Sequence, residues 1–134
     1  MKYSILLLVS IVFLNCSPKM APDAGWGRGR WVVAEMKGVP VQQSGGRRDA
    51  HISFDVSQKQ FSGNGGCNQI NGTYTVGRNS IAFKDVTSTK MACQDLAFEK
   101  AFLEALASVN KYELKGEELV LKNKKKVVLV LKAR

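Results

Sequence analysis

Histidine and cysteine are scarce in this chain. His51 is the only histidine, and Cys16, Cys67 and Cys93 are the only cysteines, among 134 residues. A structural zinc site usually needs four ligands, and a hydroxyl nucleophile needs a nearby base to activate it. No base is placed to activate the hydroxyl-rich segment 87–89. The sequence therefore predicts no metal site, no cofactor and no enzyme activity.

Long apolar runs are also lacking, with one exception at the N-terminus. The run from Ile5 to Leu14 follows the basic residue Lys2 and is shorter than the ~20 residues that a membrane-spanning helix needs. A basic residue followed by a short apolar run is typical of an export signal. We therefore predict a signal peptide over residues 1–15.

Cys16 directly follows this run, in the sequence Leu14-Asn15-Cys16-Ser17. This sequence resembles the bacterial lipoprotein box, in which the cysteine is acylated and the signal is cut just before it. Cys16 is then the lipidation site and a stable membrane anchor, because several acyl chains hold a protein firmly. No acidic residue follows Cys16 directly, so we expect the periplasmic face of the outer membrane. The alternative is a soluble secreted protein that is cleaved a few residues later.

Residues 17–30 have little apolar periodicity and several chain-breaking residues. Two prolines, Pro18 and Pro22, are followed by three glycines on either side of Trp26. Such a composition is typical of a linker. We therefore predict a lipidated tether over residues 16–30 and one small domain over residues 31–134.

The predicted domain consists mostly of strand-like segments, which are short, rich in β-branched or aromatic residues, and in several cases alternating. They cover residues 31–36, 51–56, 72–76, 80–83, 112–114, 118–121 and 126–131. Compact turn sequences at 77–79 and 115–117 indicate antiparallel hairpins.

One segment has helical periodicity instead. Between Asp95 and Val109 the apolar residues recur every three or four positions, whereas Glu99, Lys100 and Glu104 lie off that face. Asp95 is placed to cap the first turn. An amphipathic helix must bury its apolar face, and the sheet is the available partner. We therefore predict an α+β fold, in which a curved antiparallel sheet or half-open barrel is closed by one amphipathic helix.

Five motifs follow one another in this domain: Gly66-Cys67-Asn68, Gly72-Thr73-Tyr74-Thr75-Val76, Thr87-Ser88-Thr89-Lys90-Met91-Ala92-Cys93, Phe98-Glu99-Lys100-Ala101-Phe102 and Tyr112-Glu113-Leu114. Taken in this order, they resemble the META domain, the HslJ-like family of bacterial heat-inducible lipoproteins. The resemblance implies an α+β fold, an envelope location, and a role in heat or envelope stress and antibiotic tolerance, without an accepted enzyme activity. Lys90 stands where many members carry arginine, which puts any bidentate contact in question.

Cys67 and Cys93 remain as a pair once Cys16 is acylated. In an oxidising compartment such a pair favours a disulfide, which would stabilise the domain by roughly 3 kcal/mol. Two buried reduced cysteines, or a pair of reactive thiols, are the alternatives. Close to these cysteines, Met91 is expected in the core, and three asparagines are interpreted as turn formers: Asn64, Asn68 and Asn71.

Positive charge is concentrated near the C-terminus. Once the signal is removed, 19 basic and 11 acidic residues remain, a net charge of +8. Four lysines, Lys122, Lys124, Lys125 and Lys126, lie at or beside the predicted turn between the last two strands. They are candidates for contact with anionic phospholipid or lipopolysaccharide. The alternative is a solvated turn that keeps a sheet edge soluble. Nucleic acid is not an expected partner of an exported chain.

Together these features predict a non-enzymatic envelope lipoprotein that binds another envelope component, which could be a protein not identified by the sequence. One alternative is a carrier of a lipid or other apolar ligand between helix and sheet. Another is an inhibitor of a periplasmic hydrolase.

Overall fold

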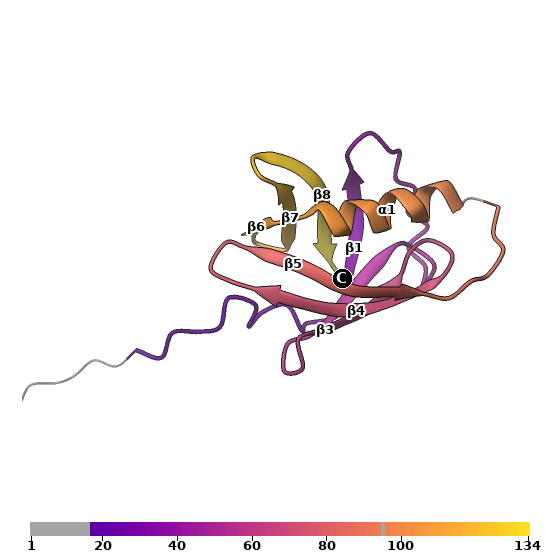
Figure 1. Ribbon diagram of the computed structural model, residues 1–134. Coiled ribbons are helices and arrows are strands. Elements are labelled where there is room, and N and C mark those ends of the chain that lie inside the picture. Colours follow the sequence, from indigo (N-terminus) through magenta and orange to yellow (C-terminus); the bar gives the residue numbers. More distant parts are fainter. Residues whose placement is uncertain (1–16, 95) are drawn as a thin grey trace, which may run out of the picture.

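The computed structural model describes residues 17–94 and 96–134 (Figure 1). The predicted signal peptide, the lipidation site Cys16 and the capping residue Asp95 lie outside the described residues. Within them, the chain forms one eight-stranded sheet and one helix. The elements are β1 (Trp31–Met36), β2 (His51–Asp55), β3 (Gln60–Asn64), β4 (Gln69–Val76), β5 (Ile81–Ser88), α1 (Leu96–Ser108), β6 (Lys111–Lys115), β7 (Glu118–Asn123) and β8 (Lys126–Ala133).

The sheet is antiparallel throughout, with the strand order β5-β4-β3-β2-β1-β8-β7-β6. It curls until its two edge strands, β5 and β6, approach each other at one end. There Ser80 and Lys111 form an isolated bridge, and the Tyr112 N–H donates to the carbonyl oxygen of Asn79 at 3.2 Å. The result is a half-open barrel, and the predicted α+β fold class is confirmed.

Helix α1 links the two edge strands and lies across the concave side of the sheet (Figure 1). It buries Phe102, Ala105 and Leu106, as its periodicity predicts. The sheet contributes alternating aliphatic side chains to the same core, because side chains on one face of a strand recur every second residue. Those fully buried are Ile52, Ile70, Leu119, Leu121, Leu129 and Leu131.

Strand β3 was not predicted from the sequence. Only Phe61 among its five residues is a large apolar side chain, so alternation is hardly visible. Gly63 lowers the strand propensity further, yet it is required here. A Cβ at Gly63 would collide with the backbone carbonyl oxygen of His51 on β2. The glycine therefore permits the close approach of β2 and β3.

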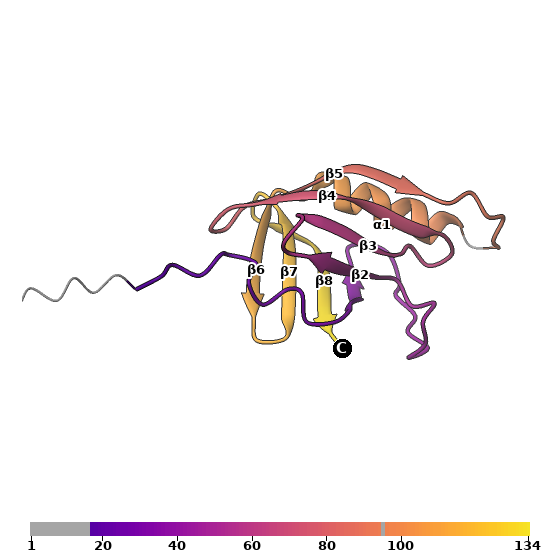
Figure 2. The ribbon, with the colours of Figure 1, turned by 90° about the horizontal axis from the view of Figure 1, so that it is seen from below.

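The prediction of a tether up to Arg30 is wrong for residues 23–30. Asp23 and Trp26 are fully buried, and Figure 2 shows this segment along the underside of the barrel before it enters β1. Arg30 exchanges two backbone hydrogen bonds with Arg134, at 3.1 and 2.8 Å. We call residues 23–30 the N-terminal strap. Its single buried tryptophan has no periodic apolar neighbours, so the pattern of a structural element is absent from the sequence.

Candidate functional site

The turn between β7 and β8 carries the lysines that the sequence singled out. Lys124, Lys125 and Lys126 are all exposed, and we call these three residues the basic turn. Lys124 has a φ of 56°, and its N–H donates to Oδ1 of Asn110 at 2.8 Å, which ties the turn to the end of α1. Lys122 does not join them, because its Nζ is paired with Glu113 on β6. Three of the four predicted lysines thus form one cationic group, which has no carboxylate partner in residues 17–94 and 96–134.

An apolar groove of about 860 Å³ opens beside the basic turn. Its walls come from the end of β1, from β8 and from the C-terminal half of α1, and we call it the apolar groove. The apolar lining residues are Met36, Val39, Ala101, Ala105 and Val128. Polar lining comes from Lys37, the basic turn, Glu104, Ser108 and Asn123. Four cations and one carboxylate therefore surround an apolar floor.

Sequence reasoning did not find this groove, because its walls come from three separate parts of the chain. One local signal was available. Ala101 and Ala105 are four residues apart, so they lie on one face of α1, and their small side chains leave space there. Such a pair of alanines also fits ordinary close packing, and the sequence alone does not distinguish the two.

Cys67 and Cys93 form a disulfide, as predicted, with their Cα atoms 6.2 Å apart. Beside it, the carboxylate of Glu99 accepts hydrogen bonds from the backbone N–H groups of Asn68 and Cys67, at 2.7 and 3.2 Å. Its other oxygen accepts from Nδ2 of Asn68 at 2.7 Å. Oδ1 of Asn68 in turn accepts from the N–H of Met91 at 2.7 Å. We call Glu99 and Asn68 the polar brace.

Three predictions around the disulfide are therefore wrong. Glu99 was placed off the buried face of the helix, yet it is buried because it satisfies donors of the β3–β4 connection. Asn68 is a buried hydrogen-bonding centre and not a turn former with left-handed backbone. Met91 is not in the core, since it is 56% exposed on the loop before α1. Asn71 lies within β4, whereas the side chain of Asn64 makes a turn contact with the N–H of Gly66.

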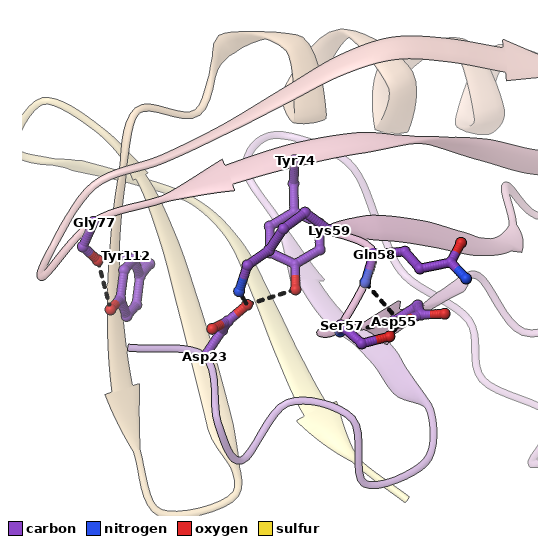
Figure 3. Close-up of polar contacts among 8 residues, drawn as sticks. All are labelled: Asp23, Asp55, Ser57, Gln58, Lys59, Tyr74, Gly77 and Tyr112. Carbon is purple, nitrogen blue, oxygen red and sulfur yellow. Dashed lines mark hydrogen bonds and ion pairs between the residues drawn. The ribbon is translucent and has the colours of Figure 1, made fainter. Parts of the chain in front are cut away.

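A second buried polar cluster holds the N-terminal strap in place (Figure 3). Oδ2 of Asp23 accepts hydrogen bonds from Lys59 Nζ and from the Tyr74 hydroxyl, each at 2.6 Å. Burial would raise the pKa of Asp23, but the hydrogen bonds from Lys59 and Tyr74 outweigh it and lower that pKa. The pKa of Tyr74 is raised by its burial and by Asp23. The cluster therefore ties the strap to the β2–β3 turn and to β4.

The one histidine and the hydroxyl-rich segment make structural contacts, and metal ligands are not grouped among the described residues. No set of three or more histidine, cysteine, aspartate or glutamate side chains is grouped for metal binding in residues 17–94 and 96–134. His51 opens β2, and its Nδ1 lies 2.7 Å from the backbone oxygen of Asp49. Thr89 uses its hydroxyl to donate to Asn68 at 3.0 Å. In the same residues, we find no helix long and apolar enough to cross a membrane.

Comparison with known structures shows where this fold occurs. A solution structure of a protein from Burkholderia xenovorans matches with a TM-score of 0.68 and 20% identity, over 85% of this chain and 88% of that one. A crystal structure of a DUF4847 family protein from Bacteroides vulgatus matches with a TM-score of 0.61 and 16% identity, over 85% and 98%. At these identities the likeness concerns the fold alone.

A search of curated proteins finds no match. The model of the META domain family matches residues 25–134, which include most of the N-terminal strap as well as the whole sheet and helix. The chain therefore belongs to the META domain family.

Proposed function

We propose that this protein is an envelope lipoprotein, anchored through Cys16, that binds anionic amphiphiles of the envelope at the apolar groove and basic turn. The ligand chemistry is a phosphate-bearing headgroup attached to an acyl chain, as in phospholipid or lipopolysaccharide. The observation that carries the proposal is the position of three unpaired lysines at the mouth of an apolar groove.

Charge and shape both support this ligand class. Within the described residues, no carboxylate lies within 4.0 Å of the ammonium groups of the basic turn, whereas Lys115, Lys122 and Lys132 are each paired with a glutamate. A basic residue near an anionic surface contributes about 1 kcal/mol to binding. The groove has the volume of a small-molecule site, which typically spans 300–1,000 Å³ and is mostly apolar.

The groove also defines where a lipid would bind. The space enclosed by α1 and the sheet is filled by large side chains, among them Trp26, Tyr74, Phe102 and Leu106, all essentially inaccessible to solvent. A carrier that holds its ligand inside the barrel would have to displace this core. Binding in the open groove requires no such change, so an acyl chain would lie against α1 with its headgroup at the basic turn.

The charge contribution is tested by vesicle co-sedimentation of the chain from Ser17 onward. We expect the triple variant Lys124→Gln, Lys125→Gln and Lys126→Gln to bind vesicles of phosphatidylglycerol and phosphatidylcholine at least tenfold more weakly than wild type at low salt. The difference should shrink as salt screens the charges.

A matched control removes three other lysines, by the substitutions Lys84→Gln, Lys115→Gln and Lys132→Gln. Lys115 and Lys132 lie at the far end of β7 from the basic turn, since Lys115 pairs with Glu118 and Glu118 with Lys132. Lys84 is on the other edge strand. Equal binding by the two triple variants would refute a specific role for the basic turn.

The apolar contribution needs a separate variant. Ala101→Phe would fill part of the groove while leaving every charge in place. We expect it to weaken binding of short-chain phosphatidylglycerol at high salt, where attraction between charges is small. Unchanged affinity of Ala101→Phe would show that the groove holds no acyl chain. In a separate experiment, free inorganic phosphate is added as a competitor, because it should displace a ligand that is bound through its headgroup alone.

A further inference from the structure

We propose that the end of the domain from which residues 17–22 emerge docks on the anionic lipid leaflet that holds the anchor. In this arrangement Met20 and Leu114 enter the interfacial region, and Lys19 and Arg78 lie at the lipid phosphates. We call these four residues the anchor-side face. The inference rests on the proposed function, because the anchor at Cys16 and the anionic leaflet are part of it.

The anchor-side face combines exposed apolar and basic side chains. Met20 and Leu114 are 81% and 45% exposed, and they are among the few large apolar residues of the described chain that remain accessible. Together with Lys19, Arg78 and Tyr112 they line a groove of about 860 Å³. Ala21, Pro22 and Glu113 complete its lining, and the Glu113 carboxylate is paired with Lys115 and Lys122. An apolar centre with basic residues around it fits an anionic bilayer surface, because lipid accepts the apolar groups while phosphates attract the cations.

Two of these four residues, Arg78 and Leu114, are held in a fixed relation. The hydroxyl of Tyr112 on β6 shares its proton between the backbone oxygens of Gly77 and Arg78, at 3.0 and 2.9 Å. This contact fixes the β4–β5 turn to β6, and so it keeps Arg78 beside the strand that carries Leu114. This part of the face is therefore preformed, and Lys19 and Met20 join it from the short segment that leads to the anchor.

The N-terminal strap shortens the distance between the anchor and the domain. If the tether extended to Arg30, the domain could move ~50 Å away from an acylated Cys16, at ~3.4 Å per residue. Because Asp23 is already fixed by Lys59 and Tyr74, only the chain from Cys16 to Asp23 can extend, over ~24 Å at most. Such a short connection keeps this end of the domain close to the leaflet.

Docking through this face would place one end of the domain at the leaflet and the other end away from it. In Figures 1 and 2, residues 17–22, the β4–β5 turn and the β7–β8 turn all lie at the left-hand end. The loop between β5 and α1, which carries Met91 and Cys93, lies at the right-hand end. Docking through the anchor-side face would therefore turn the basic turn toward the same leaflet and Met91 toward the periplasm.

Introduced tryptophans can test which end contacts lipid. The native Trp26 and Trp31 are buried, so quenching by brominated phosphatidylcholine in vesicles that also contain phosphatidylglycerol reports mainly an added residue. Leu114→Trp probes the anchor-side face, and Met91→Trp is the matched control at an exposed apolar position of the opposite end. We expect at least threefold more quenching for Leu114→Trp, while co-sedimentation of the same samples measures how much protein is bound.

Each outcome separates this inference from the proposed function. Suppose that both variants bind the vesicles. If Met91→Trp is then quenched as strongly as Leu114→Trp, or if neither tryptophan is quenched, docking through the anchor-side face is refuted, while anionic lipid binding stands. Quenching of Leu114→Trp that persists in the triple glutamine variant of the basic turn supports docking without that turn. If the wild-type chain does not bind the vesicles, both the docking and the proposed function are refuted. If the chain forms a dimer in solution that Leu114→Asn abolishes, the anchor-side face binds a second copy of the chain instead of lipid.

Discussion

Deletion of residues 17–30, whose composition suggests a linker, should remove much of the stability of the domain. Trp26 is fully buried, with its ring centroid 5.0 Å from that of Phe54 and 4.9 Å from that of Tyr112. Truncation of a buried tryptophan to alanine typically costs about 3–5 kcal/mol. Loss of Asp23 also leaves the buried hydroxyl of Tyr74 without its partner, at about 1–3 kcal/mol.

The sum is about 4–8 kcal/mol, which is a large part of the 5–15 kcal/mol that stabilises a typical domain. For a domain near 100 residues, each kcal/mol shifts the melting temperature by roughly 4–8 °C, so we expect a decrease of at least about 15 °C. A fraction of the molecules of the chain that begins at Trp31 should therefore be unfolded at physiological temperature.

Urea and thermal unfolding, followed by circular dichroism, measure this effect on two deletions and one point variant. A chain that begins at Pro22 retains Asp23 and Trp26, and it should match the chain from Ser17 within about 0.5 kcal/mol. Trp26→Ala should show most of the loss seen for the chain that begins at Trp31. If that shortest chain unfolds at the same midpoint as the chain from Pro22, the N-terminal strap contributes nothing and the reasoning fails.

Three further predictions concern the anchor, the disulfide and pH. Cys16→Ala should leave an uncleaved or soluble protein, and normal processing with membrane partition would contradict lipidation there. Thiol labelling of the unfolded, unreduced chain should find Cys67 and Cys93 blocked, and reduction should lower the melting temperature by more than about 10 °C, because the bond closes a loop across 26 positions. Burial would raise the pKa of Asp23, but its hydrogen bonds lower that pKa below the value in the unfolded chain. The contribution of Asp23 to the free energy of unfolding is therefore present above about pH 4 and is lost as the pH falls further. Asp23→Asn should flatten this part of the stability profile, and an unchanged profile would contradict the role of the cluster.

The parts of the fold that the sequence predicts are those with a local pattern of apolar residues. Helix α1 shows it clearly, because Phe102, Ala105 and Leu106 recur on one face. Strands β1 and β8 are recognised instead by short apolar runs, each of which buries three consecutive residues. The N-terminal strap and β3 show no such pattern, since their place depends on single long-range contacts of Trp26 and on the close approach at Gly63. Spacing cannot reveal such contacts.

The candidate site divides in the same way. The position of the basic turn between two strands is predicted correctly, because its lysines are adjacent in sequence and flanked by strand-like segments. Membrane contact by these lysines stays a prediction, and the ion pair of Lys122 was not foreseen because its partner is on β6 and not nearby in sequence. The apolar groove and the anchor-side face each combine residues from at least three segments, so only the fold brings them together.

If the chain is exported as proposed, its three cysteines create a pairing problem that the polar brace helps to solve. An odd thiol can exchange with a disulfide, so before the proposed acylation Cys16 could compete for either partner. Glu99 binds the N–H of Cys67 from α1, and Asn68 binds the N–H of Met91, two residues before Cys93. These contacts bring the two cysteine segments together without the covalent bond, and the Cα separation of 6.2 Å is within the range that a disulfide needs. The fold thereby selects Cys67 and Cys93 as partners.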